Sequence, residues 1–145
     1  MSSVFSSIIA GQLPGRFAYA DDTCVVLSTI EPIVDGHMLV IPRQEVNSFV
    51  EAGDELLGHL MMVAKRVGLA LQQAYPGTRA VMIIAGFDVA HLHLHVFPAL
   101  DQASMVFALA HTVPGEQLDT ACALVRQALT DIGYGAFVPP NMTSL

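Results

Sequence analysis

The sequence has few basic residues and no long apolar run. Only six Lys and Arg stand against thirteen Asp and Glu, which gives a formal net charge of −7. Because nucleic-acid binding needs a basic face that releases counterions, this balance argues against a general nucleic-acid partner. No apolar run reaches the roughly 18 residues that a bilayer requires, so we expect no membrane association.

Cysteine is also scarce. Cys24 and Cys122 are too few and too widely separated for a disulfide framework, and we expect both to be reduced and buried. The segment from Met1 to Gly11 has no basic region of the kind that opens a secretory signal. These features together predict a cytoplasmic protein.

The chain is rich in apolar residues. Its 145 residues are 53% hydrophobic and 13% charged, which predicts one folded domain over residues 1–145. The apolar surplus exceeds what a small core needs, and a buried homodimer interface is one plausible place for it.

The hydrophobic pattern predicts an α+β fold. Apolar residues at helical spacing predict a short N-terminal helix, a long central helix and a C-terminal helix, at 4–9, 54–75 and about 116–131. Apolar runs bounded by turn residues predict five strands, at 16–20, 24–28, 37–41, 80–85 and 92–97. Prolines at 42 and 98 would end the third and fifth strands. One long helical insertion among the strands favours an antiparallel meander with the helices on one face.

Three histidines at alternate positions are the most informative motif. His91, His93 and His95 alternate with apolar residues, so in a strand they share one face at spacings of roughly 6.5–7 Å. His37 lies where a loop enters a predicted central strand. Imidazole can act as nucleophile, acid, base or metal ligand near neutral pH. The residues therefore leave open phosphate chemistry or a metal centre of His37, His93 and His95 with an open position.

Two blocks of sequence around these histidines carry a family resemblance. They run from Ile30 to Arg43 and from Ala85 to Phe97, and Phe5, Ile8 and Leu13-Pro14 precede them. Together they resemble the histidine triad (HIT) family, and most closely its Hint-like branch. The resemblance covers about residues 3–100 and implies a HIT-like fold with a five-stranded, mainly antiparallel sheet. Residues 101–145 then form a C-terminal extension.

The resemblance implies a homodimeric, nucleotide-binding hydrolase or nucleotidyl transferase without a cofactor. Its substrate would be a purine nucleotide of AMP or GMP type, cleaved at the α-phosphate of a phosphoramidate, a dinucleoside polyphosphate or a related bond. His93 would be the nucleophile that forms a nucleotidyl-histidine. His95 would donate to phosphate oxygens, His37 would support the cluster, and His91 would orient the nucleophile. The implied nucleotide-binding residues are Phe5, Ile8, Leu13, Leu27, Thr29, Gly86 and Asp88.

Two departures from the family pattern affect these expectations. Many bacterial members have Cys-x-x-Cys and a further histidine that, with a triad histidine, bind structural zinc. Here those positions are Ser3, Ser6 and Glu45. Serine hydroxyls are poor zinc ligands, so we expect no structural metal.

The second departure lies around the phosphate. Thr29 replaces an acid that grips the ribose hydroxyls, and a hydroxyl accepts fewer hydrogen bonds than a carboxylate. Phe87 and Asp88 replace polar residues that contact the phosphate or the leaving group. An ionised Asp88 would repel a phosphate unless it turns away, is protonated or meets a cationic leaving group. These changes keep open a nucleotide-binding protein with little turnover.

Overall fold

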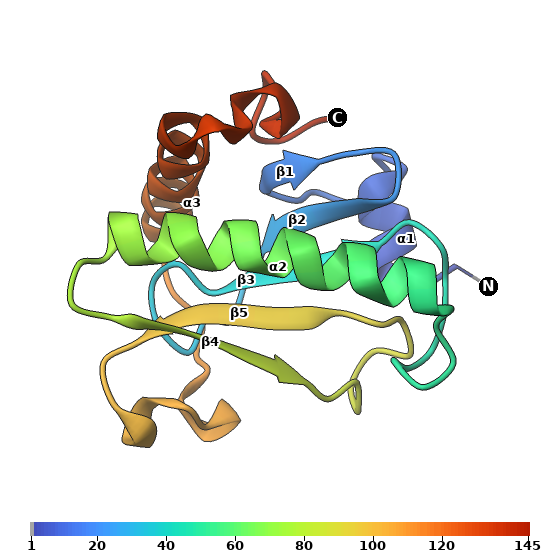
Figure 1. The fold of residues 1–145 in the computed structure, drawn as a ribbon, viewed down its shortest axis with the longest axis horizontal. Helices are drawn as coiled ribbons and strands as arrows, with labels where there is room; N and C mark the ends of the chain where they lie inside the picture. The colour runs from blue at the N-terminus through green and yellow to red at the C-terminus, as the bar shows by residue number, and fades with distance from the viewer. Residues whose placement is uncertain (1) are drawn as a thin grey trace.

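The computed structural model describes residues 2–145 and contains a five-stranded antiparallel sheet with helices on both faces (Figure 1). The strand order is β1-β2-β3-β5-β4. The predicted α+β class is confirmed, but the simple meander is wrong because β5 lies between β3 and β4. Residue 1, with which the predicted domain begins, lies outside the described residues. The strands are β1 (Phe17–Ala20), β2 (Cys24–Ser28), β3 (Met38–Pro42), β4 (Arg79–Ile84) and β5 (Leu94–Ala99).

Three α-helices accompany the sheet, close to the predicted positions. They are α1 (Val4–Ile9), α2 (Asp54–Ala74) and α3 (Gly115–Leu129). The Ser3 hydroxyl caps α1 by accepting from the Ser6 N–H at 3.0 Å, which satisfies one free donor of the first turn. The extension after β5 adds short 3₁₀ turns at Gln102–Ser104 and Phe107–Leu109. Within residues 2–145, every helix is too short or too polar to cross a bilayer.

The two faces of the sheet bury different side chains, because alternate residues of a strand point to opposite sides. On one face Val26, Val40 and Leu94 pack in a cluster with α2 and α3. On the other face Phe5 of α1 packs against Leu27 and Leu39. The expectation that the helices cover one face is therefore wrong, and Figure 1 shows α1 behind the sheet and α2 in front. Both cysteines are buried and free, as predicted.

The fifth strand is displaced by two residues from its predicted position. The Leu92 N–H donates to the Val46 carbonyl at 2.7 Å, so the backbone before Leu94 binds a loop instead of a strand. Pro98 lies inside β5 because β3 pairs with β5 only over residues 94–96, where no proline N–H is needed. Of the three alternating histidines, only His95 therefore belongs to the strand.

Candidate active site

The predicted histidines gather where β3 and β5 begin. His37 directly precedes β3, His95 lies opposite Leu39 in the β3–β5 pairing, and His93 precedes β5. The ring centroids of His93 and His95 are 4.9 Å apart, and those of His37 and His95 are 5.2 Å apart. Leu92 and its alternating apolar neighbours pack on the opposite, α2 face. The alternation thus separates the histidines from that core although two of them lie outside the strand.

A backbone carbonyl fixes the tautomer of His93. The His93 Nδ1 lies 2.7 Å from the carbonyl oxygen of His91, which can only accept, so Nδ1 carries the proton. Nε2 then keeps its lone pair, and within residues 2–145 it has no hydrogen-bond partner. The side chain is 7% exposed, and the Phe5 ring packs edge-on at 5.0 Å. Burial lowers the pKa of His93, while its hydrogen bond to the His91 carbonyl and the charge of Asp88 act against that effect.

Two consecutive hydrogen bonds fix His95 in the other tautomer, with its proton on Nε2. The Ile33 N–H donates to His37 Nδ1 at 3.0 Å, so His37 donates from Nε2 to His95 Nδ1 at 2.9 Å. His95 must then carry its proton on Nε2. Burial lowers the pKa of His37 to about 3 and that of His95 to about 4, and the neighbouring histidines add to both effects. At neutral pH the site therefore offers one ring acceptor on His93 and one ring donor on His95.

His91 contributes its backbone and not its ring. The ring is fully buried, donates from Nε2 to the Pro42 carbonyl at 2.8 Å and accepts at Nδ1 from the Ser3 hydroxyl at 2.5 Å. Both nitrogens are thus engaged away from His93. The expected orienting role of His91 stays a prediction, and its carbonyl is the group in position to perform it.

The residues at the family's zinc positions bind one another. The Ser3 N–H donates to Glu45 Oε1 at 2.7 Å, and the Ser3 and Ser6 hydroxyl oxygens lie 3.4 Å apart. Hydrogen bonds from Ser6 and Ser3 hold the pKa of Glu45 below its usual range. With His91, these residues form a polar cluster whose two hydroxyls do not fit a tetrahedral zinc site. That this chain binds no structural zinc stays a prediction.

A cavity of about 530 Å³, here called the apolar cavity, opens beside His93 and His95. Arg16 and Thr143 also line it and were not expected from the sequence. The Arg16 guanidinium is engaged, since its Nε lies 2.6 Å from an Asp119 carboxylate oxygen. The structure brings most of the expected nucleotide-binding residues together here, namely Phe5, Ile8, Leu13, Leu27, Thr29 and Asp88.

A second cavity of about 320 Å³, here called the polar cavity, is also lined by His93 and His95. Gly86, which lines only this cavity, completes the expected set. Phe107 lies against His95 with ring centroids 4.7 Å apart. Sequence reasoning missed Phe107 because it belongs to the extension, where no motif or periodicity marks it. The two cavities share Thr29, Asp88, His93 and His95.

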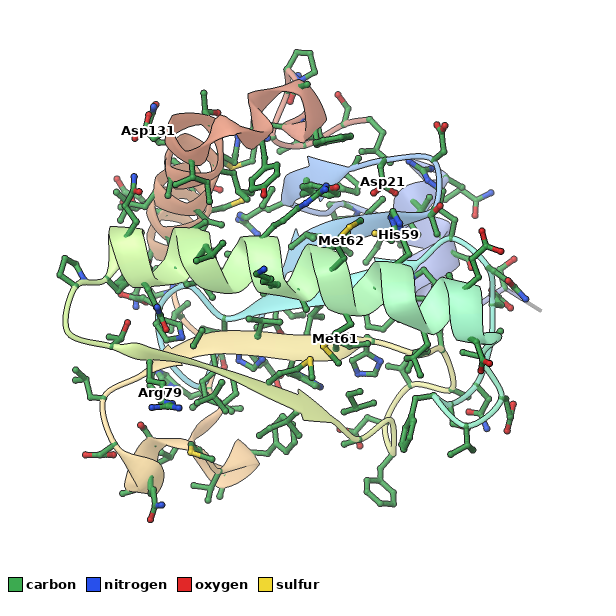
Figure 2. All side chains as sticks on the ribbon, viewed as in Figure 1. Asp21, His59, Met61, Met62, Arg79 and Asp131 are labelled. Carbon is green, nitrogen blue, oxygen red and sulfur yellow. The ribbon has the colours of Figure 1, made fainter. Side chains whose placement is uncertain are left out.

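The geometry disfavours the three-histidine metal centre. Both ring nitrogens of His37 and the Nδ1 of His95 are already hydrogen-bonded. Within the described part of the chain, three metal-ligand atoms converge in one place, where those of Asp21, Cys24 and His59 lie within 4.8 Å of one another. Figure 2 labels Asp21 and His59, whose side chains are hydrogen-bonded at 2.7 Å. Cys24 places this group on the α2 face, away from the triad.

Comparison with known proteins shows the family of this chain. Residues 10–102 match the HIT domain, and the chain belongs to the HIT family. It is 34% identical over 100 residues to an uncharacterized HIT-like protein of Synechococcus elongatus, which covers 65% of this chain and 87% of that protein. The predicted family is confirmed, while the Hint-like branch stays a prediction.

Two solved structures share the fold closely. A zinc-bound histidine triad family protein from Mycobacterium smegmatis has a TM-score of 0.81 and 25% identity, covering 93% of this chain and 98% of that one. A hypothetical histidine triad nucleotide-binding protein from Sulfolobus tokodaii strain7 has a TM-score of 0.75 and 27% identity, covering 88% and 92%. The predicted HIT-like fold is confirmed.

Proposed function

We propose that this protein is a nucleotide-binding hydrolase or nucleotidyl transferase acting at the α-phosphate of an AMP- or GMP-type nucleotide. The bond cleaved would be a phosphoramidate or a related bond, including that of a dinucleoside polyphosphate. The observation that carries the proposal is the free Nε2 lone pair of His93, whose ring is oriented by the His91 carbonyl and which lines both cavities. A neutral, oriented imidazole is the nucleophile that covalent catalysis at phosphorus requires.

The reaction would proceed in two steps. The His93 Nε2 lone pair forms a bond to phosphorus, and the bond to the leaving group breaks with its electron pair on the leaving atom. Water then releases the nucleotide from His93. Over both steps one water is consumed, its proton ending on the leaving group and its hydroxyl on phosphorus. The N–H of His95 would donate to a phosphoryl oxygen, where charge develops.

The two cavities suit the two halves of such a substrate. Phe5 and Leu27 give the apolar cavity walls suited to a purine, and Thr29 offers a hydroxyl for a ribose. The polar cavity, which Gly86 lines, would receive the leaving group. No additional cofactor is needed for this chemistry.

The test is hydrolysis of adenosine 5′-phosphoramidate by wild type and His93→Ala. We expect loss of at least about a thousandfold in kcat in the variant, since removal of a nucleophile leaves only binding and electrostatic effects. A nucleotidyl adduct on the peptide that contains His93 should appear by mass spectrometry after rapid quenching. His59→Gln is the matched control, because His59 lies on the other face. Equal rates for wild type and His93→Ala would refute the proposal.

Asp88 favours a second candidate function, a nucleotide-binding protein with little turnover. An exposed carboxylate that lines both cavities would repel the phosphate and slow attack at phosphorus. The same assay separates the candidates when combined with calorimetric titration of AMP. Measurable AMP binding together with turnover equal to that of His93→Ala would support the binder.

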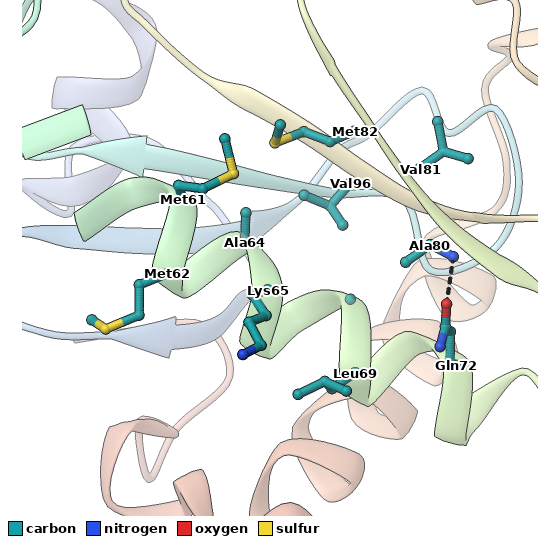
Figure 3. Close-up of a pocket in the computed structure, with 11 residues that line it drawn as sticks. Met61, Met62, Ala64, Lys65, Leu69, Gln72, Ala80, Val81, Met82 and Val96 are labelled. Carbon is teal, nitrogen blue, oxygen red and sulfur yellow. Dashed lines mark hydrogen bonds between the residues drawn. The ribbon is translucent and has the colours of Figure 1, made fainter. Parts of the chain in front are cut away.

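We also propose a homodimer built on α2 and the edge strand β4. Met61, Met62, Leu69 and Met82 are exposed large apolar side chains around one hollow of this surface (Figure 3). β4 ends the sheet, so a second copy could pair with its free edge around a two-fold axis. Light scattering should give a dimer for wild type and a monomer for Met82→Glu. Glu116→Gln, an exposed change on α3, should leave the dimer intact.

A cytoplasmic location belongs to the same proposal. The two buried, unpaired cysteines support it, because stable free thiols are typical of reducing compartments. Cell fractionation with a tagged full-length chain would test it.

A further inference from the structure

The polar cavity is lined by two carboxylates and by no Lys or Arg side chain. Asp88 and Glu31 both line it, and none of the six Lys and Arg of the chain does. Within residues 2–145 neither carboxylate takes part in an ion pair. A site whose substrate carries negative charge beyond the reacting phosphate would be expected to hold Lys or Arg side chains near that charge. The charge in this cavity has the opposite sign.

The neighbouring side chains do not make the charge of the polar cavity positive. Burial lowers the pKa of His37 to about 3 and of His95 to about 4, so both rings are neutral at neutral pH. Arg16 lines only the apolar cavity, and its guanidinium is paired with Asp119. A bound phosphate would therefore meet hydrogen-bond donors, and any further anion in the polar cavity would meet two uncompensated carboxylates.

His93, the proposed nucleophile, lines the cavity that holds the two carboxylates. Its side chain is more than nine-tenths buried, its Nε2 has no partner among the described residues, and it lines both cavities. If the apolar cavity takes the nucleoside, the leaving group must depart through the polar cavity. This step rests on the function proposed above.

We propose that Asp88 and Glu31 are specificity-determining residues that favour a leaving amine carrying an additional positive charge. Anionic leaving groups, including the second nucleotide of a dinucleoside polyphosphate, would be repelled. The P–N bond breaks with its electron pair on the amine nitrogen, which takes a proton from water, while the distant cationic group keeps its charge throughout. Asp88 would also stabilise the positive charge that the His93 ring gains when Nε2 bonds to phosphorus.

Phe107 adds an independent contribution. Its ring lines the polar cavity beside the two carboxylates. An aromatic face together with carboxylates is the combination that recognises ammonium groups. This arrangement supports a quaternary or primary ammonium as the additional charge.

The experiment uses three adenosine 5′-phosphoramidates that differ in the amine. One carries 2-(trimethylammonio)ethylamine, the second its uncharged isostere 3,3-dimethylbutylamine, and the third β-alanine, which is anionic. We expect kcat/KM to fall in that order, with roughly a tenfold difference between the two isosteres, since a nearby opposite charge gives effects of this size at a partly exposed site. The preference should shrink in 1 M NaCl, where the screening length falls to about 3 Å.

The variant Glu31→Gln/Asp88→Asn removes both charges with little change of shape. Its ratio of kcat/KM between the two isosteres should fall toward one, while the matched control Asp22→Asn/Glu116→Gln keeps the wild-type ratio. A wild-type ratio of one with both isosteres hydrolysed would overturn this inference and leave the proposed function standing. Turnover of all three substrates no faster than in His93→Ala would overturn both.

Discussion

The His37 Nε2 lies 2.9 Å from the His95 Nδ1, and this bond connects a backbone amide to the histidine cluster. Because the Ile33 N–H donates to the other nitrogen of His37, His37 carries its proton on Nε2 and donates it to His95 Nδ1. His95 must then carry its own proton on Nε2. His93 receives the opposite assignment from the His91 carbonyl. Two chemically identical side chains thus become one donor and one acceptor through their surroundings alone.

The first prediction concerns stability at acid pH. Unfolded His37 binds a proton below about pH 6.5, whereas the folded ring does so only near 3 because burial lowers its pKa. Its contribution is therefore fully present above pH 6.5 and is lost as the pH falls toward 3. Between pH 6 and 4 it should lower the free energy of unfolding by up to about 1.4 kcal/mol per pH unit.

Urea unfolding followed by circular dichroism would measure this slope in wild type and His37→Asn. The slope should be smaller in the variant by up to the same amount, whatever the variant costs in absolute stability. His111→Asn, at an exposed histidine, serves as the control. Identical slopes in wild type and His37→Asn would contradict the assignment.

The second prediction concerns the pH dependence of activity. Burial lowers the pKa of His93, so its Nε2 should stay unprotonated below pH 6.5 and the acid limb of kcat/KM should lie below that value. The charge of Asp88 raises the pKa of His93, so Asp88→Asn should move the acid limb to still lower pH. A rate profile from pH 4 to 8 with adenosine 5′-phosphoramidate would measure both, with Asp22→Asn as control. An acid limb at the same pH in wild type and Asp88→Asn would show that the carboxylate does not act on His93.

Local patterns in the sequence predicted much of this site. The alternation of His93 and His95 with leucines predicted which side chains point away from the core, because successive side chains of an extended segment point to opposite faces. The same pattern could not show that the strand begins at Leu94. That boundary depends on the bond from the Leu92 N–H to the Val46 carbonyl, a contact between distant segments.

Phe107 and Thr143, which the sequence did not predict as site residues, also reach the site through tertiary contacts. Phe107 reaches His95 through a segment of short turns that has no hydrophobic period to read. Thr143 reaches the apolar cavity because the Phe17 N–H binds the Met142 carbonyl at 2.7 Å and holds the end of the chain beside β1. Residue type gives no signal for either position.

The third prediction concerns the bond from Ser3 to His91. Ser3→Ala would leave the fully buried Nδ1 of His91 without its donor and would also remove the cap of α1, and the lost donor alone should cost about 1–3 kcal/mol of unfolding free energy. Ser6→Ala is the matched control, since its hydroxyl lies 3.4 Å from that of Ser3 and does not reach the ring, and it should cost clearly less. Chemical denaturation of both variants would decide. Equal costs would mean that the ring does not depend on Ser3.

The fourth prediction uses the same cluster to test the family's zinc position. Ser3 connects the four residues of this cluster, because its hydroxyl binds His91 and lies 3.4 Å from that of Ser6, while its N–H binds Glu45. The variant Ser3→Cys/Ser6→Cys/Glu45→His supplies two thiolates and two imidazoles, the ligand set typical of tetrahedral zinc.

We expect this triple variant to bind one zinc per chain and wild type to bind none at this cluster. Elemental analysis after purification in zinc gives the stoichiometry, and cobalt substitution should give the intense visible bands of a tetrahedral thiolate site. The control Ser3→Cys/Ser6→Cys keeps Glu45 and should bind more weakly, because a carboxylate replaces an imidazole. Zinc should also raise the melting temperature of the triple variant, since a metal that binds only the folded state stabilises it. Stoichiometric zinc in wild type that disappears in Ser3→Ala would show that hydroxyl groups suffice at this position and that the expected loss of the metal is wrong.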